Sequence, residues 1–89
     1  MATWEIIVHG RIQGVGYRWQ VQQIAIQYEI RGYVRNHSDG SVFILAEAEE
    51  HMLESFKLAI ATGYCMARVD KIEVDKLDSA KKYHDFKIK

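Results

Sequence analysis

The order in which strand-like and helix-like patterns follow one another limits this chain to few folds. Apolar and polar residues alternate over residues 4–8, which predicts a strand. Residues 17–28 carry apolar side chains at helical spacing with glutamines between them, which predicts an amphipathic helix. Two further strands, over residues 31–36 and 41–47, are joined by a segment with an Asp-Gly dipeptide that is typical of a hairpin.

The second half of the chain predicts one more helix and two more strands. The helix is expected from about residue 50 to residue 62, where Gly63 ends it, and a strand follows at residues 69–74. A polar loop over residues 76–82 and a last short strand over residues 86–88 complete the chain. This βαββαβ order predicts an α/β (α+β) fold, the ferredoxin-like sandwich, with an antiparallel sheet and two helices on one face. We expect residues 1–89 to form a single domain.

The segment between the first strand and the first helix, residues 8–18 (VHGRIQGVGYR), is rich in glycine and arginine. Glycine lets a backbone approach a ligand closely, and a helix start offers unpaired N–H groups to an anion. Arg18 adds a fork of donors that matches phosphate oxygens. These features predict a cradle for a phosphoryl group. The same features are equally compatible with a glycine-rich turn that binds no ligand. The segment matches neither the dinucleotide-binding fingerprint nor the Walker motif.

The motifs of the chain resemble those of the acylphosphatase family. Residues 9–18 (HGRIQGVGYR), 32–36 (GYVRN) and 39–42 (DGSV) carry the resemblance, which extends over almost the whole chain. The chain departs from the usual family residues at Tyr17 (usually Phe), Tyr33 (usually Trp), Ala48 (usually Gly) and Tyr64 (usually Pro). The resemblance implies the ferredoxin-like fold and the hydrolysis of acyl phosphates.

The resemblance also implies roles for particular residues. In acylphosphatases, an arginine at the position of Arg18 holds the phosphate, and an asparagine at the position of Asn36 orients the attacking water. We expect the amide groups of the loop to bind the phosphoryl group, namely those of Gln13, Gly14, Val15, Gly16 and Tyr17. The local sequence alone favours a different role for Asn36, as a cap of the hairpin.

The chemistry of this reaction needs few side chains. Cleavage of an acyl phosphate expels a carboxylate, whose conjugate acid has a pKa of roughly 4, so no general acid is required. We expect no metal and no cofactor, because the four histidines are scattered without a neighbouring cluster of ligands. Arg11 is a candidate for supporting the cradle, whereas His37 is expected to be a turn residue.

Composition excludes several classes of function. Twelve basic and twelve acidic residues give no net charge, which argues against nucleic acid as a partner. A single cysteine, Cys65, allows no internal disulfide and is expected to be buried. No signal peptide or segment of membrane-spanning length is recognisable. We therefore expect a cytoplasmic monomer that acts on a small-molecule acyl phosphate.

Three alternatives remain open at this stage. Ferredoxin-like sheets with exposed aromatic residues bind single-stranded RNA, and residues 31–34 (RGYV) distantly resemble the start of such a motif. The chain is also compatible with a module that handles carbamoyl phosphate, although such modules usually belong to larger proteins. A catalytically inactive relative is disfavoured because Arg18 and Asn36 are both present.

Overall fold

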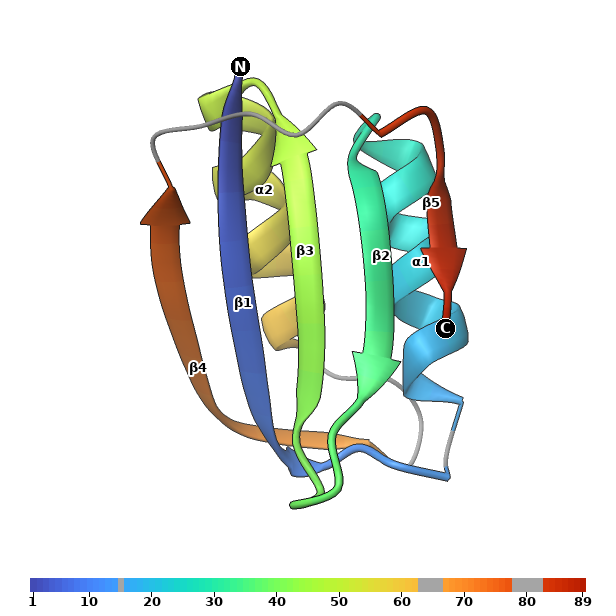
Figure 1. Ribbon diagram of the computed structural model, residues 1–89. Coiled ribbons are helices and arrows are strands. Elements are labelled where there is room, and N and C mark those ends of the chain that lie inside the picture. Colours follow the sequence, from blue (N-terminus) through green and yellow to red (C-terminus); the bar gives the residue numbers. More distant parts are fainter. Residues whose placement is uncertain (15, 63–66, 78–82) are drawn as a thin grey trace.

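The computed structural model describes residues 1–14, 16–62, 67–77 and 83–89. Its elements in chain order are β1 (Ala2–Arg11), α1 (Tyr17–Gln27), β2 (Arg31–Asn36), β3 (Val42–Ala48), α2 (Glu50–Ala61), β4 (Arg68–Leu77) and β5 (Phe86–Ile88) (Figure 1). The expectations for Val15, for Gly63 and for Cys65 lie outside the described residues.

The strands form one sheet in the order β4-β1-β3-β2-β5, and both helices lie against the same face of it (Figure 1). This arrangement confirms the predicted ferredoxin-like α+β sandwich. The four long strands pair antiparallel, as expected, but β5 pairs parallel to β2. The N–H of Gly32 donates to the carbonyl oxygen of Asp85 at 2.8 Å, so β5 begins beside the start of β2 and runs in the same direction. Alternation in a three-residue strand does not encode its direction of pairing, and the prediction of a wholly antiparallel sheet was wrong here.

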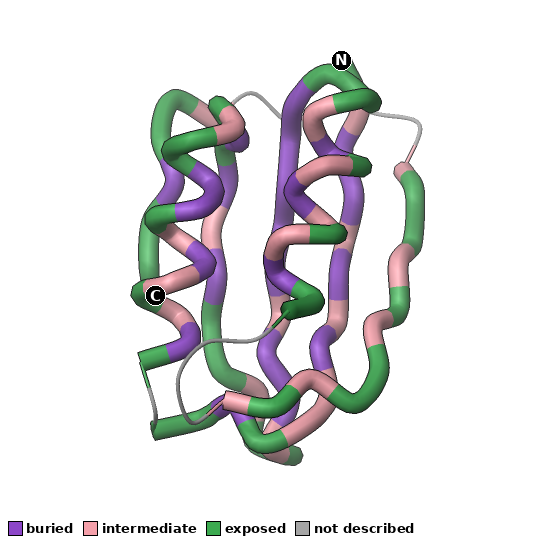
Figure 2. The backbone as a smooth tube through the Cα atoms, turned by 180° about the vertical axis from the view of Figure 1, so that it is seen from behind, coloured by how far each residue is buried: buried purple, intermediate pink, exposed green. Residues whose placement is uncertain are grey.

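The hydrophobic core fills the space between the sheet and the two helices. Most residues on the inner faces are buried, whereas those on the outer faces are intermediate or exposed, apart from Thr3, Leu45 and Glu47, which are buried (Figure 2). The predicted apolar stripes are confirmed for both helices, by burial of Tyr17, Val21, Ile24 and Ala25 on α1 and of Leu53, Phe56 and Ile60 on α2. Burying each large apolar side chain contributes about 1.5–3 kcal/mol. No helix within the described ranges is long and apolar enough to cross a membrane.

Strand β4 continues further than the sequence predicts. Lys76 and Leu77 were expected to begin a polar loop, but they pair with Trp4 and Thr3 of β1. The Lys76 ammonium lies 4.7 Å from the centre of the Trp4 ring, a cation–π contact. Backbone pairing of this kind does not require apolar side chains, so the hydrophobic pattern could not reveal it. The rest of that loop, residues 78–82, lies outside the described residues.

Gly10 stands at a shift in the register of pairing between β1 and β4. Its φ is +146°, and a Cβ atom added there would lie 2.0 Å from the carbonyl oxygen of Arg68. We expect Gly10→Ala to lower the free energy of unfolding by about 2–3 kcal/mol, because both backbone strain and a backbone clash oppose the side chain. Urea unfolding measures this change.

Gly40→Ala is the matched control for that variant. Gly40 also has a positive φ, +95°, but no atom lies within 4 Å of the added Cβ. Its substitution therefore adds strain without a clash. Equal losses in the two variants would contradict a steric role for Gly10.

Candidate functional site

The loop between β1 and α1 turns through two glycines in the left-handed conformation. Gly14 has a φ of 75° and Gly16, the N-cap of α1, has a φ of 82°. The first hydrogen bond of the helix is donated by the N–H of Gln20 to the carbonyl of Gly16, at 3.1 Å. The N–H groups of Tyr17 and Arg18 consequently have no partner within the helix. No acidic residue lies in this first turn, so its positive end is available to an anion.

Arg18 stands in that first turn beside a small surface hollow. The hollow has a volume of about 180 Å³. It is lined by Ile12, Gly14, Gly16, Tyr17, Arg18, Trp19 and Ile88, and we name it the Arg18 hollow. The structure therefore brings together Gly14, Gly16, Tyr17 and Arg18 among the residues expected at the site. The guanidinium carries a permanent positive charge to this point.

Arg18 is also linked to the end of β2. Its Nη1 donates to the main-chain oxygen of Lys89 at 3.1 Å. The N–H of Lys89 in turn donates to the carbonyl of Val34 at 2.8 Å. Val34 precedes Asn36 by two residues on the same strand, so two successive hydrogen bonds lead from the guanidinium to the end of β2 that carries Asn36.

Gln13 makes a contact that the sequence did not suggest. Its Nε2 donates to the carbonyl oxygens of His37, at 2.9 Å, and of Ser41, at 3.0 Å. The Gln13 side chain thus ties the glycine loop to the β2–β3 hairpin and does not line the Arg18 hollow. Nothing in the local pattern of residues 12–16 indicates which carbonyls a glutamine amide will reach.

Asn36 ends β2 with an exposed side chain, and its backbone pairs with Val42. Within the described part of the chain, the Asn36 amide has no hydrogen-bond partner. It does not line the Arg18 hollow either, and in the described part of the chain no hydrogen bond joins Asn36 to Arg18. The hairpin is instead closed by other groups, which argues against the alternative that Asn36 is its cap.

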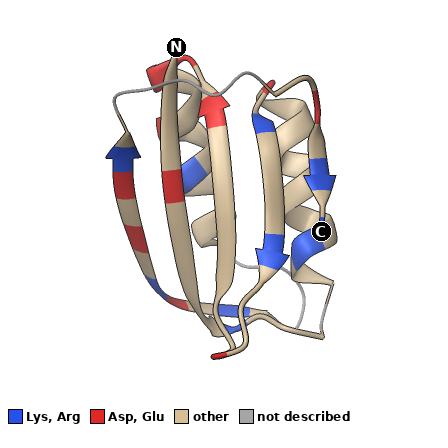
Figure 3. Ribbon diagram, viewed as in Figure 1, with Lys and Arg blue, Asp and Glu red and all other residues tan. Residues whose placement is uncertain are grey.

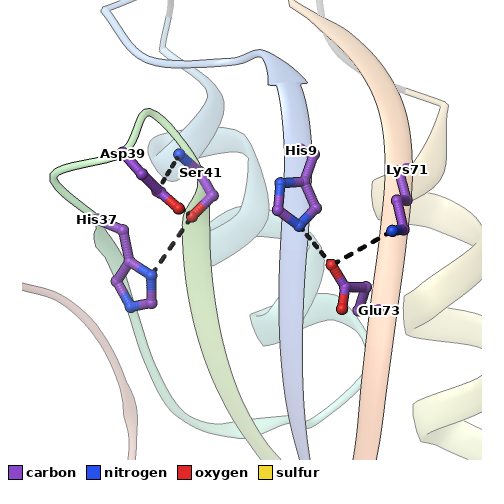
Figure 4. A network of polar contacts seen from close by, with 6 residues as sticks. All are labelled: His9, His37, Asp39, Ser41, Lys71 and Glu73. Carbon is purple, nitrogen blue, oxygen red and sulfur yellow. Dashed lines mark hydrogen bonds and ion pairs between the residues drawn. The ribbon is translucent and has the colours of Figure 1, made fainter.

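The groups that close the hairpin are His37, Asp39 and Ser41 (Figure 4). Both the hydroxyl of Ser41, at 2.6 Å, and its N–H, at 2.9 Å, donate to Oδ1 of Asp39. These bonds favour the ionised form and lower the pKa of Asp39. The same hydroxyl lies 3.3 Å from Nδ1 of His37.

This trio contains a serine, a histidine and an aspartate, yet it is not arranged for nucleophilic catalysis. The carboxylate of Asp39 contacts the serine and not the imidazole, so it does not orient the ring as a catalytic triad requires. Ser41 is only 3% exposed. The ring of His37 stacks on Phe43 with centroids 5.4 Å apart. These contacts give His37 a place in the turn, as expected from the sequence.

Other charged groups of the sequence motif lie away from the hollow. His9 Nε2 contacts Glu73 Oε1 at 2.7 Å, and Lys71 Nζ lies 3.7 Å from the same oxygen (Figure 4). Such exposed pairs contribute about 0–1 kcal/mol. Arg11 is exposed at the end of β1 and does not line the Arg18 hollow. Among the residues described, no group of three His, Cys, Asp or Glu side chains is placed to hold a metal ion.

Comparison with known proteins decides the family. The sequence model described as Acylphosphatase matches residues 4–88. The chain belongs to the acylphosphatase family. It is 42% identical to an acylphosphatase of Bacillus subtilis, over 99% of this chain and 97% of that protein. It is 39% identical to one of Archaeoglobus fulgidus, over 99% and 98% of the two chains.

Solved structures share the fold over almost the whole of this chain. The crystal structure of acylphosphatase from Bacillus subtilis superposes with a TM-score of 0.97 and covers 99% of this chain and 98% of that one. A crystal structure of full-length HypF, in a phosphate- and nucleotide-bound form, is 35% identical with a TM-score of 0.90. The match covers 98% of this chain but 11% of HypF.

One departure from the usual acylphosphatase residues has a structural explanation. Tyr17 stands where family members usually carry Phe, and its hydroxyl donates to the carbonyl of Ile60 at 2.8 Å inside the core. A buried phenol needs such a partner. Burial raises the pKa of Tyr17, so the hydroxyl remains a neutral donor that ties the start of α1 to the end of α2.

We expect Gln13→Ala to lower both stability and turnover of this acylphosphatase. Losing two hydrogen bonds to the hairpin should lower the free energy of unfolding by about 1–2 kcal/mol. The loop and the hairpin would then be free to shift relative to each other, so kcat should fall while inhibition by inorganic phosphate changes less. Thermal unfolding and steady-state kinetics on one preparation measure both effects. Gln23→Ala, on the exposed side of α1, is the matched control. If the two variants behave alike, the link through Gln13 is unimportant.

Proposed function

We propose that this chain hydrolyses acyl phosphates to a carboxylate and inorganic phosphate, with Arg18 and the loop amides binding the phosphoryl group and Asn36 orienting the attacking water. Membership of the acylphosphatase family over residues 4–88 supports the reaction. The observation that supports the phosphoryl-binding role of Arg18 and the loop amides is the Arg18 hollow, where a permanent cation meets the open start of a helix.

The hollow supplies what a phosphoryl group needs. The N–H groups at the start of α1 and the Arg18 guanidinium can donate to its equatorial oxygens and compensate their charge. No metal ion is required for that task in this proposal, because the positive charge comes from the chain itself. Of the described residues that line the hollow, none is Asp, Glu, His or Lys. The hydroxyl of Tyr17 donates to the carbonyl of Ile60 inside the core, so it is not available as a general acid either.

A site without a general acid is suited to a leaving group that departs without being protonated. A carboxylate departs as a stable anion, since its conjugate acid has a pKa of roughly 4. An alkoxide needs a proton as it leaves. The site is therefore suited to acyl phosphates and poorly suited to phosphate monoesters of ordinary alcohols.

Asn36 is proposed to place the water. Its amide is exposed, has no partner among the described residues, and lies at the end of β2 that the Val34–Lys89–Arg18 hydrogen bonds reach. The amide oxygen can accept a hydrogen bond from a water and hold it in line with the phosphorus. A strong base is not needed if the proton of the water passes to a phosphate oxygen.

Single-stranded RNA is the second candidate ligand, and the open face of the sheet is what favours it. The rings of Tyr33 and Phe43 lie 5.9 Å apart there, with Arg35 5.3 Å from Phe43 and Lys89 4.3 Å from Tyr33. Bases stack on such surfaces. However, basic residues on β2 and β5 are offset by acidic residues on β1 and β4 (Figure 3), and the chain has no net charge. Binding in a gel-shift assay with single-stranded RNA, without acyl phosphate hydrolysis, would favour this alternative.

The stability of the leaving group predicts which phosphates this chain cleaves. Acetyl phosphate should be hydrolysed at least about 10³-fold faster in kcat/KM than glycerol phosphate, since a general acid contributes typically 10²–10⁴-fold where it is needed. Release of inorganic phosphate measures both rates, and the assay should run equally well in EDTA. Comparable rates for the two substrates would overturn the argument. Activity lost in EDTA and restored by Mg²⁺ would overturn the metal-free proposal.

A further inference from the structure

We propose that a pocket on the open face of the sheet, between β2 and β5, binds a free nucleoside monophosphate. The pocket has a volume of about 310 Å³, and its described lining includes Tyr33, Tyr83, Lys87 and Lys89. We name it the tyrosine pocket. Small-molecule sites of proteins have volumes of about 300–1,000 Å³, so this one has room for a single nucleotide. The site is separate from the Arg18 hollow, and its ligand goes beyond the proposed function.

Two aromatic rings form the apolar wall of the tyrosine pocket. The Tyr33 ring lies edge-on to that of Tyr83, with centroids 6.0 Å apart and an angle of 65° between the ring planes. Glu47 of β3 fixes the backbone that carries the second ring, because its Oε1 accepts the N–H of Tyr83 at 3.2 Å. Glu47 is only 1% exposed, so this anchor is a buried side chain. A nucleobase can stack on rings that are held in this way.

Two lysines of β5 supply positive charge next to these rings. Phe86 of the same strand is buried and its ring contacts that of Phe56 on α2, so Lys87 and Lys89 lie on the open face, because side chains alternate along a strand. Lys87 pairs with Tyr33 in the parallel register of β5 and β2. The Lys89 ammonium lies 4.3 Å from the centre of the Tyr33 ring. No carboxylate within the described ranges forms an ion pair with either ammonium, so both can bind a phosphate.

A nucleotide has the same two parts as the lining of the pocket, a flat base and a compact anion. Inorganic phosphate has nothing to place against the rings, and Asp85 at the rim offsets one of the two lysine charges. A longer strand of RNA needs basic surface beyond the pocket, but the other half of the sheet carries acidic residues on β1 and β4 (Figure 3). The lining therefore favours a free nucleotide.

An NMR titration of the full chain with AMP tests the proposal. It is run in inorganic phosphate, because the Arg18 hollow can accept the phosphate of AMP. The backbone amide signals of Tyr33, Lys87 and Lys89 should shift and saturate with a Kd below about 1 mM, while that of Gly14 at the hollow should shift less. Adenosine and ribose 5-phosphate each lack one half of the ligand, and both should bind at least about 5-fold more weakly.

Two variants and one matched control locate the bound nucleotide. Tyr33→Leu removes a stacking ring and should weaken AMP binding by about 5- to 30-fold. Lys87→Gln removes one exposed charge and should weaken it by about 2- to 5-fold. Lys57→Gln, on α2 and therefore on the other side of the sheet, should bind AMP as the unmodified chain does. Thermal unfolding checks each variant, and Lys87→Gln carries the comparison if the partly buried Tyr33 proves necessary for folding.

Three results would overturn the tyrosine pocket as a nucleotide site. They are the absence of saturable shifts on β2 and β5, shifts confined to the Arg18 hollow, and equal affinity for AMP in Lys87→Gln and Lys57→Gln. A short single-stranded RNA that binds far more tightly than AMP, and loses this advantage in Arg35→Gln, would identify RNA as the ligand and contradict the free nucleotide. None of these measurements depends on hydrolysis of acyl phosphates, so the proposed function stands or falls separately.

Discussion

Replacing Arg18 with lysine should lower kcat/KM for acetyl phosphate by about 10²–10³-fold, the usual loss when one positioned donor to a developing charge is removed. The lysine keeps the charge but loses the planar fork of donors, so it cannot contact two phosphoryl oxygens together. The inhibition constant for inorganic phosphate should rise as well, because the guanidinium binds the phosphoryl group in substrate and product alike. Steady-state kinetics with phosphate as inhibitor measures both changes.

Two controls keep this result interpretable. Arg35→Lys is the matched variant, since Arg35 lies on the open face of the sheet above Phe43 and away from the hollow. It should retain its activity. The free energy of unfolding of Arg18→Lys should fall by no more than about 1 kcal/mol, which is the contribution of the hydrogen bond to Lys89. An Arg18→Lys variant with unchanged kinetics would remove Arg18 from phosphoryl binding.

Asn36→Ala should produce the opposite pattern of kinetic effects. We expect kcat to fall by about 10²–10³-fold, again by analogy with loss of one positioned polar group, while inhibition by phosphate stays within about 2-fold. The reason is that the amide is proposed to hold the water and not the anion. Stability should change by less than about 0.5 kcal/mol, because the exposed amide has no partner among the described residues.

The stability measurement decides between the two roles considered for Asn36. A hairpin cap would lose about 1 kcal/mol on substitution and leave kcat unchanged. Ser38→Ala, in the exposed part of the same hairpin, serves as the control for general disturbance of the turn. A folded Asn36→Ala variant that keeps full kcat would contradict the proposed placement of the water.

The order of helices and strands could be predicted because burial on one face of an element imposes a regular spacing on its apolar residues. The spacing from Tyr17 to Ala25 identifies α1, and the alternation at Trp4, Ile6 and Val8 identifies β1. Features fixed by backbone pairing alone were not predictable. The continuation of β4 through Leu77 and the parallel pairing of β5 depend on which backbone groups meet, and polar side chains tolerate either arrangement.

The candidate site also contains residues that the sequence could identify and contacts that it could not. The glycines and Arg18 were predicted because the chemistry of anion binding requires such residues next to a helix start. The side chain of Gln13 was assigned no partner, since its two acceptors belong to a hairpin more than twenty residues away in sequence.

Hydrolysis of benzoyl phosphate in water enriched with oxygen-18, in the presence of EDTA, distinguishes attack on the phosphorus from attack on the carbonyl carbon. In the proposed reaction, the loop and Arg18 bind the phosphoryl group and a water held by Asn36 attacks the phosphorus. The label should therefore appear in inorganic phosphate and not in benzoate, and Asn36→Ala should slow its incorporation without redirecting it. Label recovered in benzoate would show attack on the carbonyl carbon and contradict the account.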